Sequence, residues 1–422
     1  MIPRLRLLKT DTFLRNNAVF FVGTIIYSLL NFLFYPVMGR LLTPNYFGEV
    51  QTLFSILSHV TIFFNVLGLV VINIVANQKD RKTANKTIIE LEKFALLLSF
   101  ATFAVFLILV VPLKHFFQFS TSWPLVGLGV TILFSMPSAF RRAVLQGAKD
   151  FVALSWSNII FSVLKLIFAV VLVLLGLKTL GTILAVLIAQ IASLAYIIWR
   201  LKKMGENYRL RDTKMSLPDM TAIKPELVYS GLTLVISLIF TIQYSIDVLS
   251  VKHYFSPSVA GLYAGISTIS NIIFFAAGSV NGVLLATIKI GSTANKILLR
   301  KSLILTLLVC GGIFTVFTLF PQKIIRLLIG ETYVSYAHYL VGISLALLLV
   351  SIANLLFIYY LAQRAYAIGI VAISGSVITY LLMLANHASV QAIINNVITG
   401  SAVLLVGITV FGFMKEGKLK SD

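Results

Sequence analysis

Long apolar stretches separated by short polar connections dominate this sequence. Twelve stretches hold roughly 20 or more mostly apolar residues, which is the length that an α-helix needs to cross about 30 Å of hydrocarbon. Their continuity predicts helices and excludes the alternating segments of about ten residues that build outer-membrane β-barrels. The predicted spans are 17–41, 50–76, 94–113, 123–145, 152–176, 180–199, 227–251, 259–288, 302–320, 335–361, 367–386 and 389–413.

The composition supports a membrane protein. Of the 422 residues, 59% are hydrophobic and 11% are charged, whereas about 25% of the residues in soluble domains are charged. One core cannot bury so much apolar surface, so lipid must be the second solvent. The single cysteine, Cys310, excludes an internal disulfide, and the five histidines show no metal-ligand spacing. We therefore expect no metal and no cofactor.

The net charge of +20 is interpreted as a signal of orientation. If the N-terminus is cytoplasmic, the cytoplasmic segments hold 27 of the 34 Lys and Arg residues and the outer connections hold six. Cytoplasmic loops of membrane proteins carry such an excess. Both termini are thus predicted to be cytoplasmic. The basic residues can contact anionic phospholipids, and nucleic-acid binding is not expected.

Two turns in the sequence repeat each other. Leu42–Gly48 and Phe255–Gly261 both read apolar–[Ser/Thr]–Pro–x–x–x–Gly, and their prolines are 213 positions apart. A hydroxyl residue before proline is a good N-cap, with proline at the first helical position, so each motif is predicted to start a helix. A looser echo joins 145–151 to 361–366. The repeat predicts two copies of six spans with the same orientation, an arrangement known in transporters.

The polar connection near the midpoint is the natural linker between these copies. We predict an N-terminal lobe over 1–205, a cytoplasmic linker over 206–226 and a C-terminal lobe over 227–422. No other connection is long enough for a catalytic domain, so an enzyme is not expected.

Several of these motifs resemble a known family. The segments Gly39–Gly48, Leu145–Gly147 and Gly261–Ala264 are similar to those of the polysaccharide biosynthesis flippases (Wzx-type, O-antigen) of the MATE-like (MOP) superfamily. The resemblance implies twelve helices in two six-helix lobes around a central cavity that work by alternating access. It also implies a bacterial inner-membrane protein that moves undecaprenyl-diphosphate-linked oligosaccharides to the outer leaflet, alongside other polysaccharide assembly proteins.

Ionisable residues inside spans are costly and rare, so they are candidates for function. Lys165 lies about 20 Å from the inner end of its span and is a candidate to bind the diphosphate or an acidic sugar. A neighbouring carboxylate or snorkelling is the structural alternative. Asp247 lies near the outer end of its span and is a candidate for coupling to H⁺ or Na⁺, although it could instead pair with Arg40, Lys252 or Lys165.

Further polar residues are weaker candidates. Arg141, Arg142 and Arg364 end helices on the inner side and could receive the anionic headgroup there, although orientation charge alone explains them. Hydrogen bonding between helices is the alternative for the polar residues within spans. The remaining candidates for substrate binding are Arg40, Asn31, Gln243, Tyr244 and Asn271.

Three alternatives remain at the level of sequence. A MATE-type ion-coupled multidrug or cation exporter would require more carboxylates in its cavity than this sequence offers, since only Asp247 is clearly inside a span and Glu49 lies at an outer edge. A polysaccharide polymerase or glycosyltransferase would require positioned carboxylates and a sizeable outer loop, but the outer connections are short. A lipid-linked peptidoglycan precursor flippase usually has two further spans. No Walker-type loop is present, so the membrane potential or an ion gradient is the expected energy source.

Overall fold

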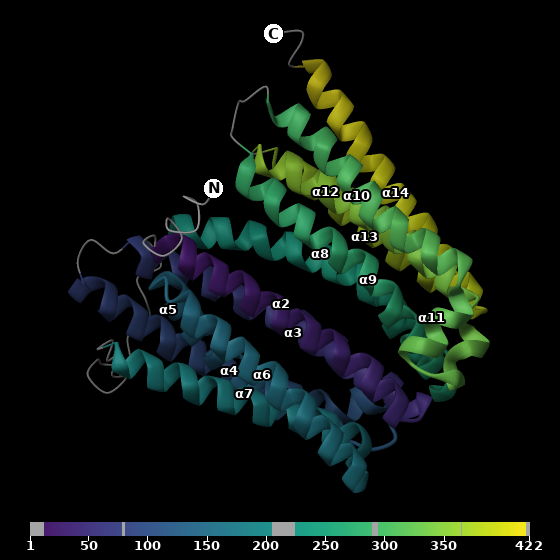
Figure 1. The fold of residues 1–422 in the computed structure, drawn as a ribbon, viewed down its shortest axis with the longest axis horizontal. Helices are drawn as coiled ribbons and strands as arrows, with labels where there is room; N and C mark the ends of the chain where they lie inside the picture. Colours follow the sequence, from purple (N-terminus) through teal and green to yellow (C-terminus); the bar gives the residue numbers. More distant parts are fainter. Residues whose placement is uncertain (1–11, 78–80, 205–223, 289–293, 364, 419–422) are drawn as a thin grey trace, which may run out of the picture. The chain divides into compact units, whose positions relative to one another are not determined.

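The computed structural model describes residues 12–77, 81–204, 224–288, 294–363 and 365–418, and every regular element in these ranges is a helix (Figure 1). Within these ranges, ten stretches are long and apolar enough to cross a membrane. The predicted all-helical, multi-pass fold is confirmed. The long helices are α2 (Thr12–Leu41), α3 (Pro44–Asn77), α4 (Arg81–Phe116), α5 (Trp123–Gly147), α6 (Phe151–Leu172), α7 (Lys178–Lys203), α8 (Lys224–Tyr254), α9 (Pro257–Thr287), α10 (Ala294–Leu319), α12 (Tyr339–Ala362), α13 (Ile368–Ala385) and α14 (Val390–Lys418).

The predicted number of twelve spans is not established. The stretch Phe151–Lys203 counts as one of the ten, and α8 is not among the ten found in the described residues. Within that stretch, the π-helix η1 (Val173–Leu177) joins α6 to α7, with positive φ angles at Gly176 (88°) and Lys178 (49°). The chain turns back there, because α6 and α7 pack side by side (Figure 1).

The chain divides into two compact units. Unit 1 comprises Met1–Leu42 and Ile56–Leu234, and unit 2 comprises Thr43–Ser55 and Val235–Asp422. In unit 1, α6 packs against α2 and α7, and α5 packs against α4 and α7. In unit 2, α12 contacts α9, α10 and α14, and α13 packs against α14. The predicted linker 206–226 lies almost wholly outside the described residues, so the lobe boundaries stay a prediction.

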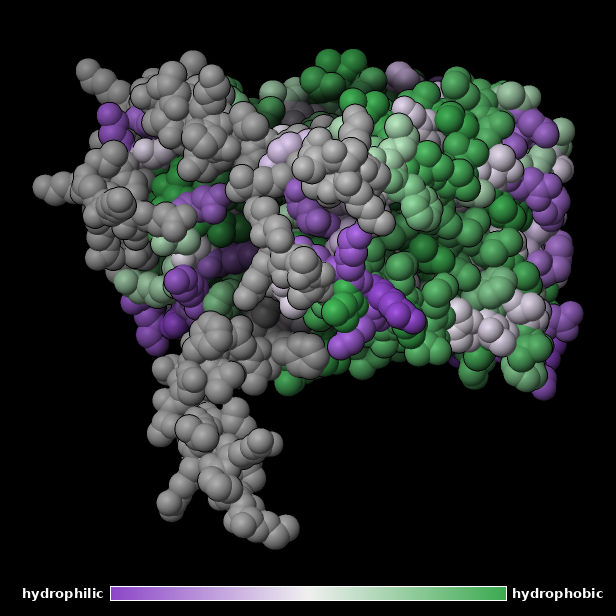
Figure 2. Space-filling model, turned by 90° about the horizontal axis from the view of Figure 1, so that it is seen from above, coloured by the Kyte–Doolittle hydropathy of each residue, from purple (hydrophilic) through white to green (hydrophobic). Residues whose placement is uncertain are grey.

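Large apolar side chains are exposed along several helices. They include Ile108 on α4 (76% exposed), Leu308 on α10 (69%) and Ile370 on α13 (69%). Figure 2 shows a broad surface of hydrophobic side chains in green, which gives way to hydrophilic side chains in purple at its right-hand edge. Apolar patches of this extent are rare on monomeric soluble proteins and are expected where side chains face lipid.

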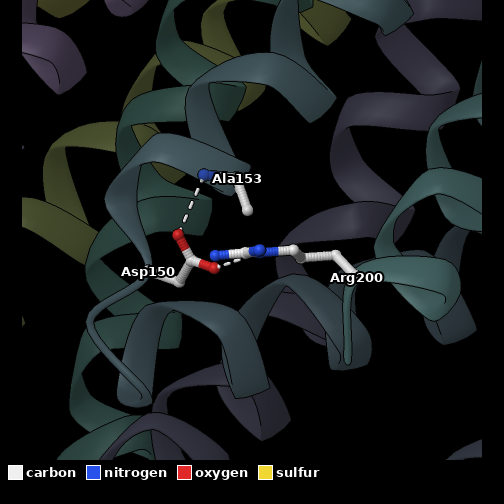
Figure 3. Close-up of polar contacts among 3 residues, drawn as sticks. All are labelled: Asp150, Ala153 and Arg200. Carbon is white, nitrogen blue, oxygen red and sulfur yellow. Dashed lines mark hydrogen bonds and ion pairs between the residues drawn. The ribbon is translucent and has the colours of Figure 1, made fainter. Parts of the chain in front are cut away.

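A carboxylate joins the turn between α5 and α6 to the end of α7. Asp150 caps α6 by accepting a hydrogen bond from the Ala153 backbone N–H (3.1 Å). Its other oxygen accepts a hydrogen bond from Arg200 Nε at 2.7 Å (Figure 3). An N-cap bond of this kind typically contributes about 1 kcal/mol. The contact therefore fixes the position of α6, which carries Lys165.

The two repeated motifs start helices, as predicted. α3 begins at Pro44 and α9 begins at Pro257. The expected hydroxyl cap is absent at the second motif, since the Ser256 side chain makes no capping hydrogen bond. The close packing of the final glycines explains the repeated motif better than helix capping does. A Cβ atom added at Gly261 would lie 1.7 Å from the Pro44 carbonyl oxygen, and one at Gly48 would lie 2.9 Å from the Gly261 Cα. The two helix starts thus meet backbone to backbone within unit 2.

Candidate functional site

Lys165 is buried in unit 1 between α6 and α2. Its side chain is 5% exposed, and its Nζ donates a hydrogen bond to the Asn31 Oδ1. The ammonium lies 4.5 Å from the centroid of the Phe34 ring and 5.8 Å from that of Phe161. Asn31 is held in turn, because its Nδ2 donates to the Tyr27 carbonyl oxygen (3.0 Å). Among the described residues, none of the ion pairs involves Lys165.

Arg142 on α5 faces the same aromatic ring. Its guanidinium carbon lies 5.7 Å from the Phe161 centroid. The two Nη atoms donate to Asn158 Oδ1 (2.9 Å) and to Ser193 Oγ (3.2 Å), while Nε is buried without a hydrogen-bond partner among the described residues. Each of these contacts is neutral. The structure therefore brings together two cations that were predicted as separate sites, one mid-span and one at the inner entrance.

This cluster of Lys165, Arg142, Phe161, Phe34 and Asn31, which we call the cation cluster, has an energetic consequence. Cation–π contacts contribute about 0.5–2 kcal/mol each, whereas removing a cation from water costs several kcal/mol when no carboxylate pairs with it. The contacts present compensate only part of that cost. An anionic ligand would offset the remainder through charge-assisted hydrogen bonds.

The other predicted basic residues have different surroundings. Arg141 Nε lies 2.5 Å from the Glu92 Oε1, and the Glu92 side chain is almost fully buried, so this charge is already balanced within unit 1. Arg40 is exposed in the last turn of α2. Arg364 lies outside the described residues. The contacts of Arg141 and Arg364 with the headgroup at the inner entrance, and the contact of Arg40 with the substrate, stay predictions.

Asp247 on α8 is buried in unit 2 and is 3% exposed. Its Oδ2 accepts hydrogen bonds from the Tyr263 Oη (2.7 Å) and the Ser267 Oγ (3.1 Å), both on α9. Its Oδ1 has no hydrogen-bond partner among the described residues. The hydrogen bonds that the structure gives Asp247 thus come from hydroxyl groups and not from the basic residues considered from the sequence. A cation or proton that binds the free oxygen would neutralise the carboxylate.

Three further candidates lie on the same two helices. Gln243, one turn before Asp247, donates from Nε2 to the Thr379 Oγ1 (3.2 Å). Tyr244 stacks on Phe274 with ring centroids 5.3 Å apart. The Asn271 Oδ1 is buried and has no hydrogen-bond partner in the described residues. The bond of Gln243 to α13 matches the expected alternative of contact between helices, and substrate contact by these residues stays a prediction.

The groups around Lys165 and Asp247 also contain residues that were not predicted. Their spacing along each helix is the sequence signal that could have identified them. Asn158, Phe161 and Lys165 lie three and four positions apart and so share one face of α6. Tyr263 and Ser267 are likewise four apart on α9. Spacing shows which residues share a face of one helix. It does not show which neighbouring helix that face meets, so Ser193 on α7 could not be predicted.

Several solved structures share this fold. A multidrug resistance MATE family transporter of the MOP superfamily, in an inward-facing conformation, is similar with a TM-score of 0.72, 12% identity and coverage of 94% of this chain and 96% of that chain. The lipid II flippase MurJ in an inward closed conformation is similar with a TM-score of 0.72 and 15% identity, and the match covers 94% of this chain and 87% of that chain. A MOP superfamily transporter from Pyrococcus furiosus, described as having a binding pocket of reverse polarity, is similar with a TM-score of 0.61 and 13% identity. That match covers 96% of this chain and 95% of that chain. The chain has the same fold as these structures, and the predicted MATE-like fold class is confirmed.

The family follows from the sequence. The family described as "Polysaccharide biosynthesis protein" matches residues 13–288, which is more than half of the chain. This chain therefore belongs to the polysaccharide biosynthesis protein family, and the resemblance predicted from its motifs is confirmed. A search of the curated proteins found no match.

Proposed function

We propose that this protein is a flippase that moves oligosaccharides linked to undecaprenyl diphosphate from the inner to the outer leaflet of the bacterial cytoplasmic membrane, with both termini in the cytoplasm. The observation that carries the proposal is the cation cluster. Two buried cations with neutral partners suit an anionic headgroup and oppose a cationic drug. Membership of a polysaccharide biosynthesis family supports the oligosaccharide, and the two lobes would open by alternating access.

The cations stand at successive depths, which suits a headgroup that moves outward. Arg142 precedes the end of α5 by five residues, or about 8 Å, whereas Lys165 is 14 residues into α6, or about 21 Å from its start. Phe161 contacts both. A diphosphate that enters near Arg142 would meet Lys165 next. With the inside negative, moving two negative charges outward would gain about 4–5 kcal/mol per 100 mV, so hydrolysis of a nucleotide is not required.

The proposal is tested in proteoliposomes that contain fluorescent undecaprenyl-diphosphate oligosaccharide. We expect the labelled sugar to become accessible to an added glycosidase faster than in protein-free vesicles. The rate should rise further when a membrane potential draws anions toward the side that holds the glycosidase. The same vesicles are assayed for efflux of a cationic dye. Dye transport without sugar translocation would contradict the proposal and favour a multidrug exporter.

Asp247 is proposed to couple transport to H⁺ or Na⁺. The support is a buried carboxylate with one oxygen held by Tyr263 and Ser267 and the other without a hydrogen bond. Asp247→Asn keeps the size of the side chain and removes the charge that a cation would neutralise. We expect this variant to transport at a rate that no longer responds to a pH or sodium gradient.

The control is Glu331→Gln, which removes an exposed carboxylate in the same unit and should leave the gradient dependence as in the native protein. An Asp247→Asn protein that still responds fully to both gradients would show that Asp247 only joins α8 to α9.

A further inference from the structure

The connection between α10 and α12 contains a short helix and a 3₁₀ turn. They are α11 (Pro321–Leu328) and η2 (Glu331–Tyr336), separated by Ile329 and by Gly330, which has a φ of 108°. A salt bridge fixes this corner, because Arg326 Nε and Nη2 bind the two Glu331 oxygens at 2.5 and 2.9 Å. Both side chains are exposed. We call α11 and η2 together the foot.

The first side of the foot packs against protein. Ile325, Ile329 and Tyr333 are 0%, 1% and 1% exposed. Tyr333 fits against Gly265 on α9, where an added Cβ would lie 2.5 Å from its ring, and its ring centroid is 5.9 Å from that of Phe47 near the start of α3. The foot therefore rests directly on the region of unit 2 where the two repeated motifs meet.

The second side is apolar but exposed. Leu327 is 73% exposed, and Phe320, immediately before α11, is 47% exposed. Ile324 lies three positions before Leu327 and so shares its face of the helix. This face continues the exposed apolar surface of α10, on which Val316 and Leu319 are 48% and 64% exposed. α10 is a candidate membrane span, so the apolar side of the foot adjoins a surface that faces lipid.

The third side is polar. Gln322 and Arg326 are four positions apart, and Lys323 lies between them; all three are exposed. Lys323 Nζ is 5.4 Å from the centroid of the Phe320 ring, so the ammonium sits at the margin of the apolar side. α11 contacts α9 and α10 within unit 2 (Figure 1).

An aromatic group begins at Tyr336, the last residue of the foot. Tyr336, His338 and Tyr339 contact one another, with ring centroids 5.3 Å apart for Tyr336–Tyr339 and 3.9 Å apart for His338–Tyr339. Tyrosine is enriched where membranes meet water, because its ring is apolar and its hydroxyl is polar. A helix with three distinct sides and a group of tyrosines therefore adjoin each other in this connection.

From this arrangement we infer that the foot lies in the plane of the membrane surface and binds the headgroup region of phospholipids, with Leu327 and Phe320 among the upper acyl chains and Lys323 level with the phosphates. A helix whose three successive sides suit protein, lipid and water is most stable at the membrane surface. The charge distribution of the sequence predicts that the leaflet is the outer one. Through Tyr333, the bilayer surface would then set the height of the junction between the two repeated motifs.

The test uses single-cysteine variants of the full chain in phospholipid nanodiscs, with Cys310 replaced by alanine and a polarity-sensitive fluorophore on the new thiol. Leu327→Cys reports on the foot. Leu308→Cys, 69% exposed in the middle of α10, is the reference for the membrane interior. Thr332→Cys is the reference for the polar side of the foot, which faces water, because Thr332 is exposed and follows Glu331, the partner of Arg326. Size-exclusion profiles that match the native protein establish that each variant is folded.

We expect the label at Leu327 to be quenched most by lipids with a spin label near the headgroup, the label at Leu308 most by lipids with a spin label deep in the acyl chain, and the label at Thr332 most by iodide in the buffer. Iodide quenching at Leu327 equal to that at Thr332 would overturn the inference, because the foot would then face water. Protection of the Leu327 label from the spin-labelled lipids and from iodide would also overturn the inference, since another protein surface would then cover the helix.

Discussion

Replacing Lys165 with alanine is expected to reduce translocation of the lipid-linked oligosaccharide about 10- to 100-fold, because a hydrogen bond to a charged group contributes about 1.5–3 kcal/mol. The variant should still reach the membrane in normal amounts. Removing a buried cation that none of the described carboxylates pairs with relieves a desolvation cost instead of leaving a charge unbalanced. Translocation is measured by the glycosidase assay in proteoliposomes, normalised to the amount of reconstituted protein.

Two further variants separate charge from packing. Lys202→Ala removes an exposed lysine at the end of α7 and should transport at the native rate. Asn31→Asp keeps the shape of the residue that accepts the Lys165 hydrogen bond but supplies a carboxylate, so it should slow transport by competing with the substrate. Native rates in both Lys165→Ala and Asn31→Asp would show that the cation cluster does not contact the transported headgroup.

Gly261→Ala is expected to be the most damaging glycine-to-alanine change among the described residues. Its Cβ would lie 1.7 Å from the carbonyl oxygen and 2.2 Å from the carbonyl carbon of Pro44. These are backbone atoms, so no side-chain rotation relieves the overlap, and the helix starts must separate. We expect a loss of about 3 kcal/mol in the free energy of unfolding, which is measured as a lower midpoint of thermal unfolding in detergent and a lower yield of monodisperse protein.

The matched control lies on the same helix. An alanine Cβ at Gly278 would meet nothing within 4 Å, so Gly278→Ala should be neutral or stabilising by up to about 1 kcal/mol through helix propensity. Gly48→Ala, with its closest contact at 2.9 Å, should fall between the two. Equal unfolding midpoints for all three variants would mean that the close approach of the two motifs contributes nothing to stability.

The helices could be predicted from the sequence because the thickness of the bilayer requires each of them to be long and apolar. Even α5, with Pro124 and Pro137, runs without a break from Trp123 to Gly147, since proline is tolerated in helices that neighbours support. The repeat of Pro44 and Pro257 predicted two helix starts correctly. It did not predict that their glycines would touch, because motifs far apart in sequence carry no information about distance.

The candidate site could be predicted only in part. Lys165 and Asp247 were conspicuous because charge inside an apolar stretch is costly. Their partners were not, since serine, tyrosine and phenylalanine are common in membrane helices. Arg141 and Arg142 are adjacent in sequence and were assigned the same role, yet Arg141 meets Glu92 while Arg142 meets Phe161. Neighbouring positions on a helix point about 100° apart and so meet different surroundings.

The assignment of Thr43–Ser55 to unit 2 bears on biosynthesis. These thirteen residues leave the ribosome early, whereas the surfaces that Phe47 and Gly48 contact, Tyr333 and Gly261, are made long afterwards. During synthesis this segment therefore waits for the contacts that the second half supplies. A second half produced on its own would lack the segment that Tyr333 and Gly261 contact.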